Sequence, residues 1–349
     1  MSNARTARLP RRGILAAGGA LGLGAVLAAC GGGDAKSGGS DSTGAAEPES
    51  GPWSFKDDRG TTVELDKVPT NIAAFTGVAA ALYDYGIEVE GVFGPTRTTA
   101  GKADVQAGDM DVSKLTIFGN KFDSFNVEQY AAFRPEVLIS TTFDDAGSLW
   151  YVPEASKEKI AKLAPSVAVS VYDRQMPEPL QRMAELAESL GADMKAAKVV
   201  EAKKDFEAAA ERLRKAAKAR PEIKVLAGSA APDVFYVSGS NYSIDLEYFK
   251  ALGVNIVEPP EEAKKATGGW FETLSWENVD TYPADVIIMD DRASTIQPAD
   301  ITEGTWKKLP AVKAGQVISR SPEPILSYDK CTPLLDNLAE AIEKAKKVS

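Results

Sequence analysis

The sequence has no histidine and only two cysteines among its 349 residues. Without an imidazole, the chain lacks the usual nitrogen ligand of zinc, copper and haem iron, and also the base of a Ser-His-Asp triad. Basic residues are in deficit, because 40 Lys and Arg stand against 50 Asp and Glu. The formal net charge of -10 argues against a general nucleic-acid-binding protein, which needs basic patches to neutralise phosphates.

The remaining composition is that of a folded protein. Hydrophobic residues make up 44% of the chain and charged residues 26%, which rules out a low-complexity disordered chain. At about 150 residues per domain, the length suits two domains. We therefore expect an acidic, folded protein with two lobes.

The N-terminus has the pattern of a secretory signal peptide. Residues 1–29 contain four arginines and no acid, and residues 14–29 form an apolar stretch shorter than the roughly 20 residues that span a bilayer. Arg11-Arg12 resembles a twin-arginine export signal, but the flanking residues match loosely, so general secretion stays open. We expect residues 1–29 to be removed on export.

The signal ends in Leu27-Ala28-Ala29-Cys30, which resembles the bacterial lipobox. That resemblance implies a diacylglyceryl group on the Cys30 thiol and cleavage just before it. Residues 31–51 are rich in Gly, Ser, Asp and Pro, so we expect residues 30–51 to be a lipidated cysteine and flexible tether. Cys331 is then the one remaining cysteine, which excludes an intramolecular disulfide, and we expect a buried, inert thiol.

From residue 52 onward, apolar runs alternate with helical patterns. This alternation predicts an α/β fold with mostly parallel central sheets. The expected strands cover residues 71–75, 89–93, 137–140, 167–172, 224–227, 254–258, 286–289 and 316–318, and the expected helices in the first half cover residues 78–85, 127–133 and 157–163.

The body repeats itself at an offset of 149 residues. Phe125 to Ile139 aligns with Leu274 to Ile288, and each segment has a Glu in a first helical turn, an acid, and then a buried strand. Residues 194–219 between the repeats are rich in Ala, Lys and Glu and contain no Gly or Pro, which predicts a long helix. A surface helix of one domain is the alternative to an interlobe strut.

These patterns predict two similar lobes joined by one long helix, with a ligand cleft between the lobes. The expected boundaries are an N-terminal lobe at residues 52–190, an interlobe helix at 191–220, and a C-terminal lobe with a terminal helix at 221–349.

Several short motifs, in this order, resemble the helical-backbone class of ABC-importer substrate-binding lipoproteins that carry iron siderophores. The motifs are Phe55-Lys-Asp-Asp-Arg-Gly60, Asn126-Val-Glu128 with Pro135-Glu136, Trp276-Glu277 with Ala284-Asp285, and Trp306 to Val317. Within this class, the sequence resembles actinobacterial binders of desferrioxamine-type hydroxamates.

The resemblance implies a non-enzymatic, monomeric receptor on the outer face of the cell membrane. It would capture an iron(III) hydroxamate siderophore of the ferrioxamine type and deliver it to an ABC permease. The siderophore itself would hold the iron, so we expect no cofactor and no protein metal ligands, and no nucleic-acid partner. The resemblance also assigns permease docking to Glu128 and Glu277. Both are alternatively helix-start acids favoured by the helix dipole.

A hydroxamate site needs aromatic surface and hydrogen-bond donors on loops that follow the strands. Arg97 in the loop after the second strand matches the region where the resembling proteins place an arginine, with an exposed loop arginine as the alternative. Arg292 and Arg320 are further candidate donors, which could instead pair with Asp290, Asp291 or Glu323. The aromatic candidates are Phe75, Phe118, Trp150, Tyr151, Tyr172, Tyr236, Tyr242, Trp270 and Trp276.

Three other functions stay open. The same transport role could serve a catecholate siderophore, a corrinoid, or haem bound through Tyr. An exported glycosidase would need an asymmetric pair of acids, which the symmetric repeat does not supply. A surface adhesion or sensing module is the third.

Overall fold

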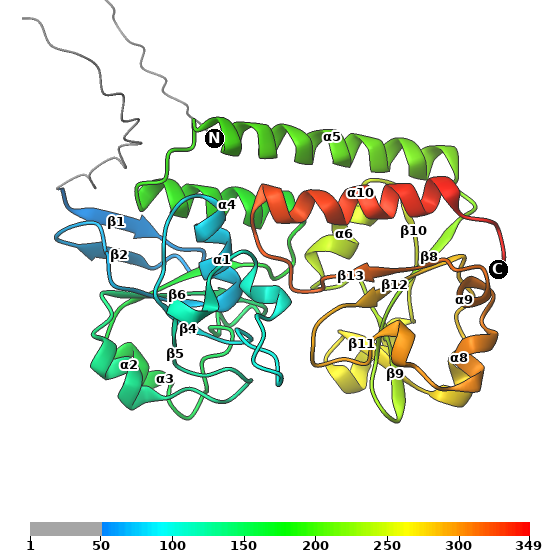
Figure 1. Ribbon diagram of the computed structural model, residues 1–349, viewed down its shortest axis with the longest axis horizontal. Helices are drawn as coiled ribbons and strands as arrows, with labels where there is room; N and C mark the ends of the chain where they lie inside the picture. The colour runs from blue at the N-terminus through cyan, green and yellow to red at the C-terminus, as the bar shows by residue number, and fades with distance from the viewer. Residues whose placement is uncertain (1–50) are drawn as a thin grey trace, which may run out of the picture. The chain divides into compact units, whose positions relative to one another are not determined.

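The computed structural model describes residues 51–349. The expected signal peptide, Cys30 and the tether up to residue 50 lie outside the described residues. Within the described part, none of the helices has the length and apolarity to cross a bilayer. Figure 1 shows two α/β lobes beneath a pair of long helices.

The N-lobe contains a five-stranded parallel sheet in the order β5-β4-β3-β6-β7. Its central strands β3 and β6 are buried throughout, as parallel strands covered on both faces must be. The strands are β3 (Ile72–Phe75), β4 (Gly91–Phe93), β5 (Thr116–Ile117), β6 (Val137–Thr142) and β7 (Ser166–Ser170). The helices are α1 (Thr76–Asp84), α2 (Val127–Phe133), α3 (Lys157–Ala161) and α4 (Pro177–Ser189), with 3-10 turns η1 (Val105–Ala107) and η2 (Val112–Lys114).

A hairpin of β1 (Trp53–Lys56) and β2 (Thr62–Leu65) closes the outer edge of this sheet. In its turn, the Asp57 carboxylate accepts a hydrogen bond from Ala168 N, and the Asp58 carboxylate accepts one from Ser170 N. Arg59 donates to the carbonyl of Ser166. The Asp-Asp-Arg motif therefore forms hydrogen bonds with backbone groups on the side of β7 that does not pair with β6.

The C-lobe contains a mixed six-stranded sheet. β10, β8, β12 and β13 are parallel as predicted, whereas β9 and β11 run antiparallel, which the sequence did not lead us to expect. The strands are β8 (Lys224–Ala230), β9 (Val234–Ser238), β10 (Asn255–Val257), β11 (Phe271–Ser275), β12 (Val286–Asp290) and β13 (Val317–Arg320). The helices are α6 (Ile244–Ala251), α7 (Glu261–Lys264), α8 (Gly304–Lys308) and α9 (Pro310–Lys313), with η3 (Lys265–Thr267), η4 (Trp276–Asn278) and η5 (Pro298–Asp300).

The strand orders confirm the internal repeat, because β4-β3-β6-β7 of the N-lobe corresponds to β10-β8-β12-β13 of the C-lobe. The repeated acids occupy equivalent places, since each precedes the central strand of its lobe. Glu136 accepts a hydrogen bond from Asn71 N, which leads into β3, and Asp285 accepts one from Lys224 N at the start of β8. The aligned helices differ, because α2 has two turns where the C-lobe has only the 3-10 turn η4.

The predicted long helix is α5 (Ala197–Ala219), which begins three residues later than the expected residue 194. The C-terminal helix α10 (Tyr328–Lys344) lies alongside it (Figure 1), held by ion pairs from Arg212 to Asp336 and Glu343. At its start, Ser327 donates to Asp84 of the N-lobe. The terminal helix, which we had assigned to the C-terminal lobe, therefore contacts both lobes.

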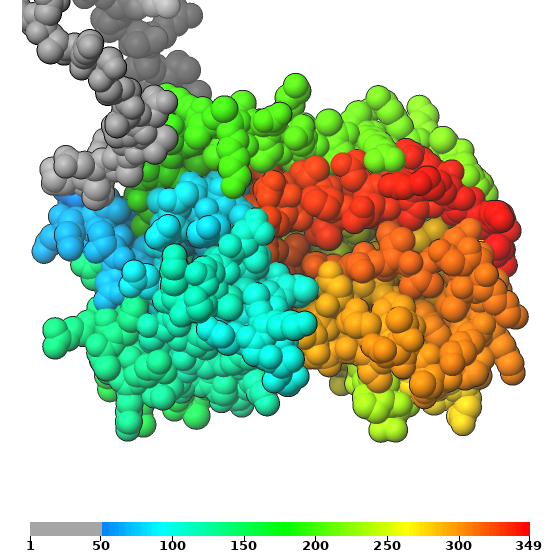
Figure 2. All heavy atoms as spheres, in the orientation of Figure 1, coloured from blue at the N-terminus to red at the C-terminus, as the bar shows by residue number. Residues whose placement is uncertain are grey.

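One hydrophobic core extends from the N-lobe through α5 and α10 into the inner face of the C-lobe. A second core fills the outer face of the C-lobe around Phe235 and Trp306. Figure 2 shows the lobes meeting along a narrow line beneath α10. Cys331 is buried in the shared core, as expected, and burial raises the pKa of its thiol.

Candidate functional site

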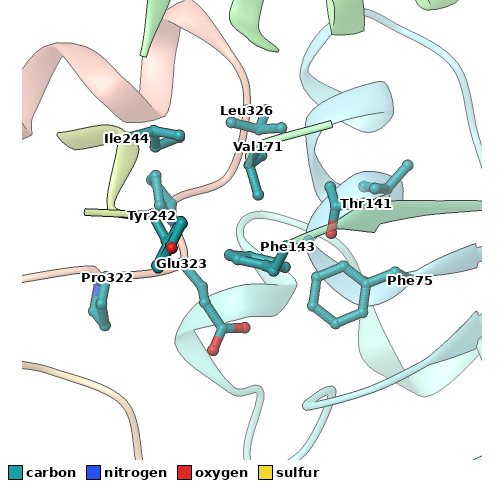
Figure 3. A pocket seen from close by; sticks show the side chains of 12 residues that line it. Phe75, Thr141, Phe143, Val171, Tyr242, Ile244, Pro322, Glu323 and Leu326 are labelled. Carbon is teal, nitrogen blue, oxygen red and sulfur yellow. The ribbon is translucent and has the colours of Figure 1, made fainter. Parts of the chain in front are cut away.

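Two adjoining cavities of about 580 and 620 Å³ lie between the lobes. Both are lined by Phe122 and Tyr151, so together they form one continuous space, which we call the groove. Its walls are loops that follow the strands of each lobe, where open α/β sheets place their ligands. A smaller cavity of about 20 Å³, with room for about one water, lies at its floor (Figure 3).

The structure brings most of the predicted ligand residues to this space. Phe75 lines the floor cavity together with Tyr242. The residues from the predicted set that line the groove are Arg97, Trp150, Tyr151, Tyr172, Tyr242, Trp270 and Arg292. They come from both lobes, so a ligand in the groove contacts both.

Aromatic rings form a nearly continuous wall. Tyr172 of the N-lobe stacks on Tyr242 of the C-lobe, with centroids 4.9 Å apart and ring planes inclined by 12°. Phe143 lies 4.6 Å from the Trp150 ring and 6.1 Å from Trp270 across the cleft. Such a wall offers a large apolar contact area to a ligand.

Two of these aromatic residues hold strained backbone conformations. Tyr151 has a φ of 60° and Tyr242 a φ of 67°, in the left-handed region that bulky residues rarely adopt. Each costs on the order of 1–3 kcal/mol, and such strain gathers at binding sites. The two tyrosines lie on opposite walls, so both lobes hold strained conformations where they face the groove.

Arg97 is held by its backbone and keeps part of its guanidinium group free. The Asn120 side chain accepts hydrogen bonds from Arg97 N at 2.8 Å and Thr96 N at 3.0 Å, and donates to Arg97 O. The guanidinium donates through Nη2 to the carbonyl of Val112 at 2.6 Å. Within residues 51–349 it forms no ion pair, so its other N–H groups are available to acceptor oxygens in the groove.

Arg292 is held quite differently, by two carboxylates. Its Nε and Nη2 donate to Asp290 at 3.0 and 2.6 Å, and its Nη1 donates to Glu323. Glu323 also accepts hydrogen bonds across the cleft, from Gln106 Nε2 at 2.9 Å and Trp150 Nε1 at 3.0 Å. A network of side chains thus connects the lobes at the centre of the cleft.

Four predicted ligand residues lie outside the groove. Phe118 is in the N-lobe core against Tyr130 and Phe133, and Trp276 packs on Phe235 in the C-lobe core. Tyr236 packs on Phe271 within the β9–β11 hairpin, and Arg320 forms a buried ion pair with Asp245. The core residues Phe118 and Trp276 follow strands whose ends turn inward, and Arg320 pairs with an acid that the sequence pattern did not single out. We therefore remove Phe118, Tyr236, Trp276 and Arg320 from the expected ligand set.

Other groove residues were missed. Phe122, whose side chain is 60% exposed, contacts Trp150 and Tyr151. Phe143 directly follows β6, so the rule that selected the other strand-end aromatics also fits it. Gln106 and Asn120 lie in loops without a helical or strand pattern, and no sequence signal distinguishes them.

The two expected docking glutamates are exposed and occupy equivalent places. Glu128 lies in the first turn of α2, which Asn126 caps by accepting from Gln129 N at 3.0 Å. Glu277 lies in η4, the corresponding turn of the C-lobe. This geometry suits both permease docking and the helix-start role, so docking stays a prediction.

Comparison with known proteins identifies the family. Residues 73–324 match the periplasmic binding protein family. The chain is 26% identical over 317 residues to the iron(3+)-hydroxamate-binding protein FhuD of Bacillus subtilis, covering 87% of this chain and 88% of that protein. It is 79% identical to the crystal structure of DesE, a ferric-siderophore receptor protein from Streptomyces coelicolor, with a TM-score of 0.84 over 85% of this chain and all of the other.

A more distant structure shares the fold. The petrobactin-binding protein YclQ of Bacillus subtilis is 15% identical, with a TM-score of 0.61 over 84% of this chain and 99% of the other. The chain belongs to the periplasmic binding protein family.

Proposed function

We propose that this member of the periplasmic binding protein family is a lipid-anchored receptor for an iron(III) hydroxamate siderophore of the ferrioxamine type. It binds the chelate in the groove between the lobes and delivers it to an ABC permease. The main observation in support is the groove, which seven of the predicted ligand residues line. The relatives named above, a hydroxamate-binding protein and a ferric-siderophore receptor, support the ligand class.

The chemistry of the groove suits such a ligand. A ferric hydroxamate presents oxygen atoms around the iron and apolar linkers at its periphery. The free N–H groups of Arg97 can donate to the oxygens, while the rings of Trp150, Tyr172 and Trp270 cover the linkers. The siderophore supplies all the iron ligands, so the protein recognises the cargo without coordinating the metal.

Haem bound through a tyrosine is the alternative, because three tyrosines line the groove. Burial, together with the nearby Glu323 charge, raises the pKa of Tyr151 to about 12. Tyr172 and Tyr242 are stacked on each other, which turns their ring faces to one another.

We further propose that residues 1–29 direct export by the twin-arginine or general secretion route, and that lipidated Cys30 anchors the protein outside the membrane. Residues 31–51 then tether the folded part, whose exposed Glu128 and Glu277 dock on the permease. Replacing both glutamates with Ala is expected to abolish uptake of the iron chelate while leaving its binding unchanged. Loss of binding in that variant would contradict separate docking and binding sites.

Tryptophan fluorescence tests the ligand class directly. Trp150 and Trp270 line the groove, so a bound ferric chelate should quench their emission. The protein from Gly31 onward is titrated separately with ferrioxamine B, a ferrichrome, a ferric catecholate and haemin. We expect saturable quenching by the hydroxamates alone; saturation by haemin or the catecholate alone would refute the proposed ligand.

A further inference from the structure

Glu323 is a C-lobe carboxylate that reaches the N-lobe wall of the groove, where it accepts hydrogen bonds from Gln106 and Trp150. It lies in the loop between β13 and α10, and its side chain is 9% exposed. Figure 3 shows Glu323 among the side chains that line the floor cavity. One oxygen accepts from Arg292, and the other accepts from Gln106 and Trp150.

This contact places a second negative charge beside Arg292. The arginine is already paired with Asp290, whose side chain is 2% exposed, so a second carboxylate leaves the centre of the cleft with a net negative charge. The other cations of the groove are Arg97 and the exposed Lys121. The acids Asp104, Asp123, Asp144 and Glu154 also line its walls.

We propose that Glu323 sets the charge selectivity of the groove by adding a second carboxylate beside Arg292, so that the cluster of Arg292, Asp290 and Glu323 carries a net negative charge. The inference rests on the proposed function and deepens it. A ferric hydroxamate that is neutral or carries a pendant ammonium group loses nothing at such a site. A ferric tris-catecholate carries three negative charges and is repelled by the uncompensated carboxylate, which is discrimination by a repulsive element.

A purely structural role for Glu323 gives a different result. If the carboxylate only held the lobes together, its loss would weaken all ligands alike. If it sets charge selectivity, its loss changes the ratio of the affinities for anionic and neutral chelates. The ratio therefore separates the two roles, whatever happens to the absolute affinity.

The test compares wild type with Glu323→Gln, Glu323→Asp and the control Glu340→Gln. Glu340 is an exposed residue of α10 paired with Lys344, so its replacement changes the formal charge equally but far from the groove. Dissociation constants are measured for ferrioxamine B and a ferric tris-catecholate. We expect Glu323→Gln to shift the affinity ratio about ten-fold toward the catecholate, and Glu323→Asp and Glu340→Gln to keep the wild-type ratio.

An unchanged ratio in Glu323→Gln overturns the inference while leaving the proposed function standing. Failure of the wild type to bind ferrioxamine B overturns the proposed function, and the inference with it. If Glu323→Gln does not fold, the wild type alone provides the test. Its preference for ferrioxamine B must then shrink as salt rises from about 0.02 to about 0.5 M, because screening weakens charge repulsion; a preference that does not change with salt refutes the inference.

Discussion

Glu136 of the N-lobe and Asp285 of the C-lobe are the same repeated acid in different surroundings. The Glu136 side chain is 30% exposed and accepts hydrogen bonds from Thr70 N and Asn71 N. Asp285 is fully buried and also accepts from the backbone of Val348 and Ser349 at the C-terminus. Asp285 therefore binds residues 348 and 349 in addition to the strand that it shares with the pattern of Glu136.

The arginines that the lobes present to the groove differ more. Arg97 donates to a backbone carbonyl, whereas Arg292 is bound by two carboxylates. The two arginines do not align in the repeat. The comparison teaches that the repeat preserves the acids that hold the sheets together, while the arginines that face the groove differ between the lobes.

The largest expected effect is on stability, from Arg292→Ala. This change leaves Asp290 and Glu323 as buried carboxylates without their partner, which costs about 3–5 kcal/mol of the free energy of unfolding. Urea denaturation measures the loss, with Arg97→Ala as the matched control. A loss below about 1 kcal/mol for Arg292→Ala would show that the two arginines are equivalent after all.

The second-largest effect on stability is expected from replacing the two repeated acids. We expect Asp285→Asn to cost about 3 kcal/mol, because an amide cannot accept from all four donors around this buried position. Glu136→Gln should cost about 1 kcal/mol, since water can reach the donors that it releases. Equal losses for the two variants, measured by urea denaturation, would contradict the contrast drawn from burial.

Affinity for the ligand is expected to depend on Arg97, whereas the free energy of unfolding is expected to depend on Arg292. Arg97→Ala should weaken ferrioxamine B binding about ten-fold, the loss of one charge-assisted hydrogen bond, while leaving the unfolding midpoint nearly unchanged. Fluorescence titration gives the affinity. Arg214→Ala, at an exposed position on α5, is the control. Wild-type affinity in Arg97→Ala would remove this residue from the site.

The smallest effect concerns pH. Hydrogen bonds from Asn71 N and Thr70 N, with the Lys67 ion pair, lower the pKa of Glu136 from 4.5 to about 2. The stability that Glu136 contributes is therefore present above about pH 4.5 and is lost as the pH falls toward 2. The difference in unfolding free energy between wild type and Glu136→Gln should shrink over that interval. A difference that stays constant from pH 6 to about pH 3 would contradict the lowered pKa.

The sequence predicted the parts of the fold that have a period or a repeat. Buried strands such as β6 and β12 appear as continuous apolar runs, and the 149-residue offset showed that the lobes are alike. Residues 234–238 and 271–275, which form β9 and β11, were not among the expected strands. The three residues between β8 and β9 are too few for the crossover that a parallel partner needs, so the antiparallel pairing of these two strands follows from the short connection. The C-terminal helix was expected, but its contact with Asp84 of the N-lobe depends on tertiary packing.

For the groove, the rule that ligand-binding residues follow strand ends selected seven residues that line it. The rule could not tell whether a given side chain points into the groove or into the core. Trp150 and Phe118 both lie near strand ends, yet only Trp150 faces the groove, because the loop after β6 turns outward while β5 leads into the core. Glu323 was considered only as a possible partner of an arginine. Its reach across the cleft depends on the distance between lobes, which the sequence does not encode locally.

The hairpin turn at Asp57, Asp58 and Arg59 has a consequence for behaviour at high concentration. An open strand edge is a template on which a second chain can add a strand, and this is a common route to aggregation. Because the turn occupies the outward N–H and C=O groups of β7, that template is already filled from within the same chain. Many copies can therefore crowd on one surface without joining through the β7 edges of their N-lobe sheets.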